Sequence, residues 1–307
     1  MREPTQIEIL ILGGTGMLGH KMFQRLRRRF PSTYCTIRRS LLEPSIRNVD
    51  LLQQGHAFEN CDAADLMAIE AFLLEHKPAV VVNCVGIVKQ RPEAKEAVPS
   101  ILLNALLPHR LAEICQGWGG RLIHISTDCV FSGKRGNYTE YDLADAEDLY
   151  GRTKSLGEVT TGNALTLRTS IVGRELVHQE SLLEWFLLQN RKSVFGYRRA
   201  WFSGVTTSEM ADVVGDLIEK HPNLCGLYQV TSQRISKYEL LCLLRDAYGL
   251  DIEIVPDDAF FRDLSMCGLK FQAATGYVCA TWPELVTELV EDETAYDEWR
   301  TVKNEVL

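Results

Sequence analysis

The 307-residue chain contains 33 lysines and arginines against 41 aspartates and glutamates, which gives a formal net charge of −8. This acidic balance argues against nucleic acid or an anionic membrane surface as the main partner. Hydrophobic residues make up 46% and charged residues 24% of the chain, which is typical of an ordered globular protein. The length suits one large α/β domain, or a large domain with a smaller one.

The nine cysteines are scattered, odd in number and without Cys-x-x-Cys or Cys/His metal spacing. This usage predicts reduced thiols rather than a disulfide framework, and no metal site. No signal-like apolar stretch follows the charged start, and no run approaches the roughly 18 apolar residues that a membrane span needs. These features predict a soluble, cytoplasmic protein without a membrane partner.

A glycine-rich turn joins the first predicted strand, residues 6–12, to a helix predicted over about residues 20–29. Gly13 allows a tight turn, Gly16 lets the backbone approach a pyrophosphate, and Gly19 lets the helix and strand pack closely. The helix N-terminus adds amide donors and partial positive charge. The pattern predicts a dinucleotide-binding loop whose cofactor contacts come from Gly13, Gly16, Met17, Leu18 and Gly19.

A second predicted strand, residues 33–37, ends in Arg38 and Arg39. Folds of this type that prefer NAD place an acidic residue here for the ribose 2′-hydroxyl, whereas an arginine accommodates the 2′-phosphate of NADP. No acidic residue follows this strand, so the sequence favours NADPH, with NADH as the alternative. Arg38 and Arg39 could also be ordinary loop charges.

Further β/α units follow along the chain. Residues 41–60 look irregular because of Pro44 and Gly55. Apolar runs and helical periodicity then predict alternating helices and strands. Listed in chain order, these are a helix over 66–76, a strand over 78–86, a helix over 98–116, a strand over 121–125, a polar loop over 132–149 and a strand over 165–168.

Polar residues end two of these strands. Asn83 and Gly86 close one strand, and Ser126, Thr127 and Asp128 close the other. In open α/β sheets, ligands bind at the carboxyl ends of the parallel strands, so these residues are candidates for a site. His124 lies inside the second strand and is predicted to be a core histidine rather than a base.

Tyr150 and Lys154 lie four residues apart at the start of another predicted helix. Residues at this spacing share one helix face, and a cation beside a phenol favours the phenolate. The pair therefore predicts a proton donor whose pKa Lys154 lowers. By itself, the same spacing also occurs by chance on exposed helices.

The second half of the chain has weaker periodicity, which predicts a smaller α/β lobe. Its predicted elements are helices over 181–189, 207–220 and 236–248, strands over 226–230 and 252–255, a basic turn with Arg191, Lys192, Arg198 and Arg199, and two closing helices. The predicted fold is α/β, a Rossmann-type doubly wound parallel sheet with a C-terminal substrate-binding lobe. The predicted domains are 1–172, which also receives part of 200–235, and 173–307.

The motifs together resemble the extended short-chain dehydrogenase/reductase family, and their order and spacing are similar to its dTDP-4-dehydrorhamnose reductase branch. The motifs are Gly13-x-x-Gly16-x-x-Gly19, Asn83-Cys84-Val85-Gly86, Ser126-Thr127-Asp128-Cys129-Val130-Phe131-Ser132-Gly133, Tyr150-x-x-x-Lys154 and Gly157-Glu158. The resemblance covers about the first 175 residues well and the remainder loosely. One departure is Cys84-Val85-Gly86, which replaces a small, alanine-rich run.

The resemblance implies a ketone reduction that needs no metal. Tyr150 would donate a proton to the substrate carbonyl, Lys154 would bind the nicotinamide ribose, and Thr127 would hold the carbonyl oxygen, with Ser126 as the adjacent alternative. Further cofactor contacts implied by the resemblance are Asp62, Asn83, Cys84, Val85, Gly86, Asn104 and Ser126. Candidate substrate residues are Lys89, Asp128, Arg174, Arg199 and Trp201, with Arg262 behind them.

Three functions follow as hypotheses. The first is an NADPH-dependent reductase of a 4-keto-6-deoxy nucleotide sugar, in polysaccharide biosynthesis. The second is an NAD(P)-dependent nucleotide-sugar epimerase or dehydratase. The third is a non-catalytic, cofactor-binding regulatory subunit, because a fold does not fix a function. A nucleotide sugar is the expected ligand, and a homodimer is compatible with the sequence.

Overall fold

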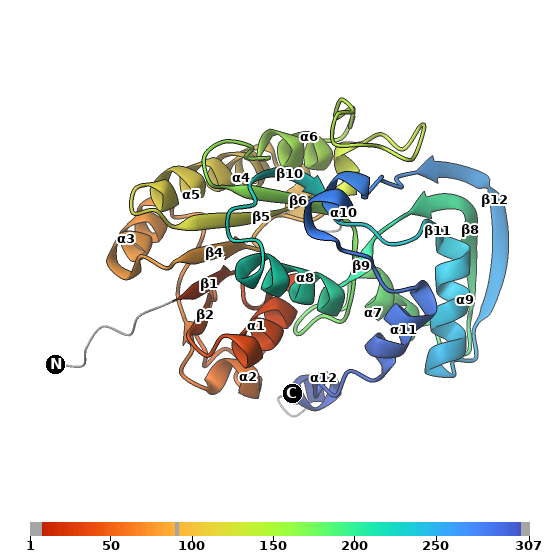
Figure 1. Ribbon diagram of the computed structural model, residues 1–307. Helices are drawn as coiled ribbons and strands as arrows, with labels where there is room; N and C mark the ends of the chain where they lie inside the picture. Colours follow the sequence, from red (N-terminus) through yellow and green to blue (C-terminus); the bar gives the residue numbers. More distant parts are fainter. Residues whose placement is uncertain (1–7, 90–91, 302–307) are drawn as a thin grey trace.

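The computed structural model describes residues 8–89 and 92–301, and the first two residues of the strand predicted over 6–12 lie outside this range. A seven-stranded sheet forms the centre of the molecule (Figure 1). All its strand pairs are parallel, in the order β10-β6-β5-β4-β1-β2-β3. The strands are β1 (Ile9–Leu12), β2 (Thr33–Thr36), β3 (Ala57–Phe58), β4 (Val80–Asn83), β5 (Arg121–Thr127), β6 (Leu165–Thr169) and β10 (Gly226–Gln229).

Helices cover both faces of this sheet because successive strand residues point to opposite sides. Ile9 and Ile11 face a core shared with α1 (Met17–Arg29) and α8 (Thr207–Glu219). Leu10 and Leu12 face a second core shared with α3 (Leu66–His76) and α5 (Leu107–Gln116). The doubly wound Rossmann-type sheet predicted from the sequence is confirmed.

Two segments of this domain differ from the prediction. The helix expected over residues 98–116 is three consecutive pieces: α4 (Ala97–Ser100), the π-helical segment η2 (Ile101–Leu106) and α5. A π-helical turn is rare and often lies at a functional site. The segment over 41–60 is not wholly irregular, because it contains α2 (Asp50–Gln53) and β3.

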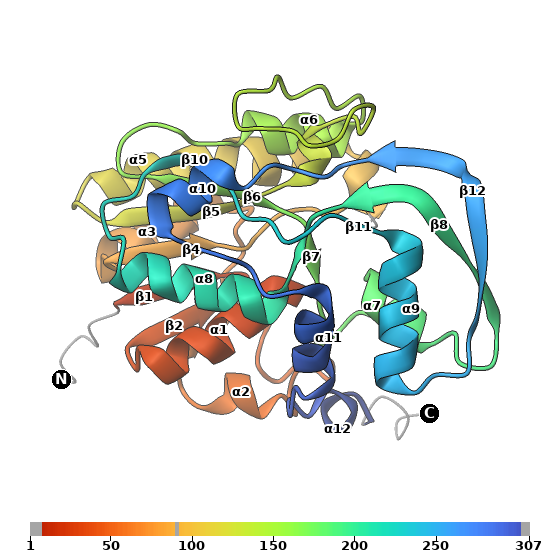
Figure 2. The ribbon, with the colours of Figure 1, turned by 45° about the vertical axis from the view of Figure 1, so that its right-hand side comes forward.

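The smaller lobe is a three-stranded sheet, β11-β8-β12, with helices packed against it (Figure 2). Its strands are β8 (Ser193–Phe202), β11 (Ile235–Ser236) and β12 (Glu253–Asp263), and its core includes α7 (Leu182–Leu187), α9 (Lys237–Tyr248) and α11 (Trp282–Val290). The basic turn predicted at Arg198 and Arg199 is wrong, since both lie in β8. Exposure alternates from Ser193 to Tyr197, as expected of a strand, but Arg198 and Arg199 are both exposed, which breaks the alternation where the turn was predicted. The strand predicted over 252–255 is only the start of β12.

The chain passes between the two sheets more than once. After β6 it enters the lobe through β7 (Ile171–Val172), which pairs with β9 (Val205–Thr206). It then returns to the large sheet through α8 and β10. Up to residue 301, where the described part of the chain ends, three helices follow β12 rather than the predicted two: α10 (Leu269–Thr275), α11 and α12 (Tyr296–Thr301). One part of the lobe, including β8, therefore comes before the last strand of the large sheet in the chain, and the other part comes after it.

In the described part of the chain, no helix is both long and apolar enough to cross a membrane. The nine cysteines are all free thiols. Within residues 8–89 and 92–301, no three His, Cys, Asp or Glu side chains gather into a group that could hold a metal ion.

Candidate active site

A cavity of about 680 Å³ lies between the carboxyl ends of the large sheet and the lobe. Its size is within the range of pockets that hold cofactors and drug-sized ligands. The lining includes the glycine loop, the residues that follow β4, the end of β5, the first turn of the helix that carries Tyr150, and side chains of β8, α9 and β12. The two halves of the predicted site therefore open onto one space.

The glycine loop has the geometry that a phosphate group requires. Gly13 has a φ of 89°, in the left-handed region that favours glycine. A Cβ at Gly19 would collide with the Gly13 carbonyl oxygen, so α1 can start close to β1 only with glycine there. α1 receives no side-chain cap, and its first residues, Met17 and Leu18, line the cavity. The uncapped amides and the helix dipole fit the pyrophosphate of a dinucleotide.

Tyr150 lies in the first turn of α6 (Leu149–Leu156), whose N-terminus is fixed by Asp148 accepting a 2.8 Å hydrogen bond from the Gly151 amide. This helix starts where the sequence predicts and ends at Leu156. The Thr127 hydroxyl accepts a 3.1 Å hydrogen bond from the Cys129 amide and is one of the groups that lower the pKa of the Tyr150 phenol, and both residues line the cavity. The two residues thus share one cavity, as the proposed proton donor and carbonyl-holding group would.

The pKa of Tyr150 is set mainly by burial. Burial raises the pKa of this phenol above its usual value, and the Thr127 side chain opposes that rise only in part. The Lys154 ammonium donates a 2.7 Å hydrogen bond to the Ile125 carbonyl, on the neighbouring strand. Lys154 is not among the largest influences on the pKa of Tyr150, and its lowering of that pKa stays a prediction.

Lys154 is a buried cation with little compensation. Burial lowers its pKa to about 8, against the favourable but smaller influence of Glu158 and Cys84. Its side chain lines the cavity together with Tyr150, one turn away on the same helix face. Among the described residues the Lys154 ammonium donates only to the Ile125 carbonyl, which leaves its other N–H donors for a ligand in the cavity.

Ser126 and Thr127 have separate partners. Ser126 donates a 2.7 Å hydrogen bond to Glu158, and Arg168 forks onto the same carboxylate with two bonds of 2.7 Å. This pair is buried, so its main effect is to fix the end of β5 against β6. Of the two hydroxyls that the sequence left open, Thr127 is the one that acts on the pKa of Tyr150.

Two asparagines brace the cavity wall rather than line it. Asn83 accepts a 3.1 Å hydrogen bond from the Val85 amide and bonds His124 through its other end. Asn104, in the π-helical segment, bonds both backbone groups of Ile87 at 2.9 and 3.1 Å. Cys84, Val85 and Gly86 do line the cavity. The asparagines thus shape the loop that would follow a bound cofactor.

His124 and the cavity cysteines are poor candidates for chemistry. His124 is fully buried, and burial holds its pKa well below the ordinary value, in line with the predicted core histidine. Burial raises the pKa of the Cys84 and Cys129 thiols to about 12. Both thiols remain protonated near neutral pH and are not nucleophiles.

Arg38, Arg39 and Asp62 lie outside the cavity, on neighbouring surface loops. The Cys61 amide bonds the Ile37 carbonyl, which joins the two loops, and both arginines are exposed. Arg39 lies 3.7 Å from Glu43, and Asp62 caps the Ala64 amide. The two arginines are placed beyond the end of β2, where a 2′-phosphate would be expected, and their role stays a prediction.

The predicted substrate residues separate into two groups. Lys89, Asp128 and Trp201 line the cavity. Lys89 pairs with Asp148, and burial raises the pKa of Asp128. Arg174 and Arg199 do not line it. Arg174 is engaged by Glu184 at 2.8 Å and by Asp297, and Arg199 lies over Phe261 on the exposed face of β8.

The sequence prediction missed several cavity residues from the lobe. Lys237 is the first residue of α9, and its ammonium lies 3.6 Å from the centre of the Phe202 ring and acts on Asp128. Aromatic side chains complete the lobe side of the cavity: Trp185, Phe195, Tyr197, Trp201, Phe202 and Phe260. The alternation of β8 could have indicated Phe195 and Tyr197, whereas no local pattern marks Lys237.

The parallel sheet, the glycine loop and the Thr127–Tyr150–Lys154 group define a protein with the extended short-chain dehydrogenase/reductase fold. Comparison with known families agrees. The model of the family described as "RmlD substrate binding domain" matches residues 7–292. The chain belongs to this family, which confirms the resemblance drawn from its motifs.

The individual relatives include two kinds of protein, a methionine adenosyltransferase subunit and a dTDP-4-dehydrorhamnose reductase. The methionine adenosyltransferase 2 subunit beta of Rattus norvegicus is 28% identical over 258 residues, covering 79% of this chain and 72% of the relative. The dTDP-4-dehydrorhamnose reductase of Streptomyces griseus is 32% identical over 150 residues, covering 48% of this chain and 43% of that protein. The first likeness is longer, and the second is confined to about half of the chain.

Solved structures share the fold. The dTDP-4-dehydrorhamnose reductase of Bacillus anthracis, in complex with NADP, has a TM-score of 0.77 at 18% identity, over 92% of this chain and 98% of its own. The UDP-glucose 4-epimerase of Thermus thermophilus, in complex with NAD, has a TM-score of 0.74 at 18% identity, over 95% and 99%. At these identities the likeness shows the fold alone.

Proposed function

We propose that this protein is an NADPH-dependent reductase of a 4-keto-6-deoxy nucleotide sugar. One observation carries the proposal: Thr127, Tyr150 and Lys154 line one cavity, and the glycine loop opens onto the same cavity. The family and the NADP in a structural relative support the choice of cofactor. When bound, the nicotinamide would supply a hydride to the keto carbon.

The residues of this chain would then handle the oxygen of the substrate carbonyl. Tyr150 would donate the proton of its hydroxyl to that oxygen, and Thr127 would hold the oxygen by hydrogen bond. Because burial raises the pKa of Tyr150, the phenol keeps its proton until negative charge develops on the substrate oxygen. Lys154 would turn its free N–H donors to the ribose.

The lobe would hold the remainder of the nucleotide sugar. The cavity offers Lys237 and Arg262 for an anionic group and Trp201 for a planar ring. Lys237 and Arg262 would have the role that the sequence analysis gave to Arg174 and Arg199, because those two arginines do not line the cavity. An indole face suits stacking on a base, and cations suit a diphosphate.

The experiment is to measure NADPH oxidation by the purified protein with dTDP- and UDP-linked 4-keto-6-deoxy sugars. Tyr150→Phe should lower kcat by roughly 10²–10⁴-fold, the usual worth of a general acid, while NADPH affinity stays unchanged. Tyr141→Phe is the matched control, since Tyr141 is 85% exposed on a loop. Full turnover by Tyr150→Phe would refute the assignment.

A second candidate function is a dinucleotide-binding subunit of a larger enzyme. The likeness to a methionine adenosyltransferase subunit favours this function, because it covers 79% of the chain. The likeness to a dTDP-4-dehydrorhamnose reductase covers 48%. The second function predicts NADPH binding without turnover of any keto-sugar, and co-purification with a larger catalytic chain. An epimerase would instead retain bound NAD and consume no cofactor.

A further inference from the structure

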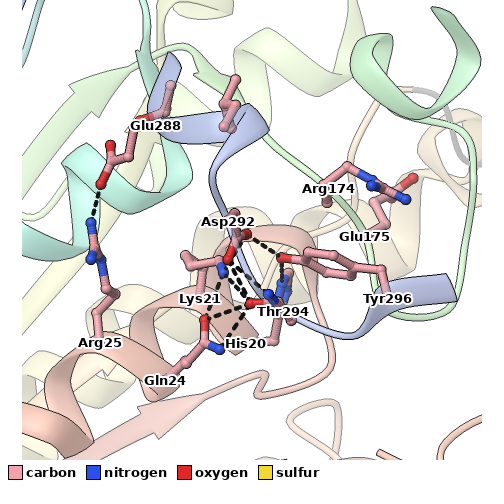
Figure 3. A network of polar contacts seen from close by, with 12 residues as sticks. His20, Lys21, Gln24, Arg25, Arg174, Glu175, Glu288, Asp292, Thr294 and Tyr296 are labelled. Atoms are coloured by element: carbon pink, nitrogen blue, oxygen red, sulfur yellow. Dashed lines mark hydrogen bonds and ion pairs between the residues drawn. The ribbon is translucent and has the colours of Figure 1, made fainter. Parts of the chain in front are cut away.

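A dense polar cluster outside the cavity ties the C-terminal segment to the helix of the glycine loop (Figure 3). The segment, residues 292–301, follows α11 and ends in α12. Its contacts reach the first two turns of α1 and, on the other side, the chain that leads from β7 to α7. We name residues 292–301 the C-terminal clamp.

Lys21 is the centre of the cluster on α1. Its ammonium is 2% exposed and donates to Gln24 at 2.6 Å, Asp292 at 2.7 Å and Thr294 at 2.9 Å. These three bonds use all three protons of the group. Thr294 in turn donates a 2.6 Å hydrogen bond to Asp292. Two of the three bonds of Lys21 therefore hold the clamp, and the third goes to Gln24 on the same helix.

His20 connects the clamp to the glycine loop, because its ring is hydrogen-bonded to both. Its Nδ1 lies 2.8 Å from the Gly16 carbonyl oxygen, and its Nε2 lies 2.8 Å from the Tyr296 hydroxyl. Burial lowers the pKa of His20 to about 3, so the ring is neutral and has one N–H. The Gly16 carbonyl can only accept, so Nδ1 donates to it, and Nε2 accepts from Tyr296.

This chain of bonds ends on the residue that precedes α1. Gly16 is the N-cap of that helix and lines the cavity. Its carbonyl accepts from both the His20 amide, at 3.1 Å, and the His20 ring. Two donors on one carbonyl fix the orientation of the Gly16–Met17 peptide, and with it the amide that points toward a phosphate.

The other side of the clamp joins the substrate end of the cavity. Arg300 forks onto Glu184 at 2.7 and 3.0 Å and also bonds the Glu175 carbonyl. Arg174 bonds the same carboxylate, and Glu184 is 1% exposed. Glu175 lines the cavity. The clamp therefore connects the wall near the substrate end with the loop at the cofactor end.

We propose that Tyr296 and His20 are positioning residues for dinucleotide binding, which hold the glycine loop through the C-terminal clamp. The inference rests on the cofactor-binding part of the proposed function and not on the reaction. A local sequence pattern does not reveal it, because His20 and Tyr296 are 276 positions apart.

The test is the equilibrium binding of NADPH, measured by calorimetry without any sugar substrate. Tyr296→Phe keeps the ring but loses the hydroxyl, and with it the 2.8 Å bond to His20 and a longer, 3.3 Å bond to Asp292. It should raise the Kd about fivefold to tenfold, mainly through the loss of the shorter bond. Tyr248→Phe is the matched control: it loses a 3.0 Å hydrogen bond to the Leu289 carbonyl, which lies in α11 and not in α1 or the glycine loop. Its Kd should stay within about twofold of the parent's.

A second variant, at His20, tests whether the bond between His20 and Tyr296 positions the glycine loop. His20→Asn can still donate to the Gly16 carbonyl but cannot reach Tyr296, so it should raise the Kd as Tyr296→Phe does. The double variant should be no worse than either single variant, because both break one path. Amide hydrogen exchange of the peptide that contains Gly16 should be faster in both variants and unchanged in Tyr248→Phe.

Three results would overturn the inference: an unchanged Kd in Tyr296→Phe, an equal loss in Tyr248→Phe, or independent, additive losses in the double variant. An absence of NADPH binding by the parent protein would overturn it as well. Failure of the reductase hypothesis would appear differently, as NADPH binding without turnover, and would leave this inference intact.

Discussion

Two regions of the molecule each bury a lysine, and they use it in opposite ways. In the C-terminal clamp, Lys21 donates three hydrogen bonds, one of them to the Asp292 carboxylate. In the cavity wall, Lys154 has one hydrogen bond to a described residue, the Ile125 carbonyl. The pKa of both lysines is lowered by burial.

The difference separates a lysine that holds the fold from one that is kept for a ligand. A buried cation is tolerated when its donors are satisfied, as at Lys21, and is costly when they are not. Lys154 leaves donors free at the edge of a large cavity. A site that binds a sugar hydroxyl needs N–H donors that the protein does not itself use, and Lys154 has such donors.

The largest expected effect is the loss of turnover when Lys154 is replaced. Lys154→Met should lower kcat about 10³-fold, within the range for a group in a proton-transfer site. The free energy of unfolding at pH 7 should not fall, because the change removes a poorly compensated buried charge. Steady-state NADPH oxidation and urea unfolding measure the two quantities. Retention of most of the turnover would contradict the comparison.

The reverse outcome is expected at Lys21. Lys21→Met should lower the free energy of unfolding by about 3 kcal/mol, because it leaves Asp292 partly buried without its partner. Turnover of the folded fraction should change far less than in Lys154→Met. Lys134→Met is the control, since Lys134 forms an exposed pair with Glu147 and should shift stability by less than about 0.5 kcal/mol. Equal losses in the two variants would refute a structural role for Lys21.

The pH dependence of stability should show the cost of the Lys154 charge. Its folded pKa of about 8 lies below the unfolded value of 10.5, so between these pH values the unfolded chain binds more protons. Stability from this group therefore rises with pH across that window, by up to about 3 kcal/mol. Subtracting the unfolding curves of Lys154→Met from those of the parent, between about pH 8 and 10, isolates the effect. A flat difference would contradict it.

Some of the site could be predicted because it is local in the sequence. The turn at Gly13, Gly16 and Gly19 and the helix spacing of Tyr150 and Lys154 depend on neighbouring residues, whose conformations and faces follow from short-range geometry. The parallel sheet follows from alternating apolar strands and helices. These features could be predicted correctly without tertiary information.

Other features depend on which distant side chains meet. Arg174 looks like a free cation in the sequence, but the fold places it against Glu184 and Asp297. The pKa of Tyr150 depends on burial that the helix spacing does not reveal.

The sequence by itself determined the fold class, the glycine loop and the pair of Tyr150 and Lys154, since each is encoded by periodicity or spacing within one or two adjacent elements. Only the tertiary structure decided that Lys237 enters the cavity and that Tyr296 reaches His20. The physical reason is that burial and hydrogen bonding between separate segments depend on how the elements pack.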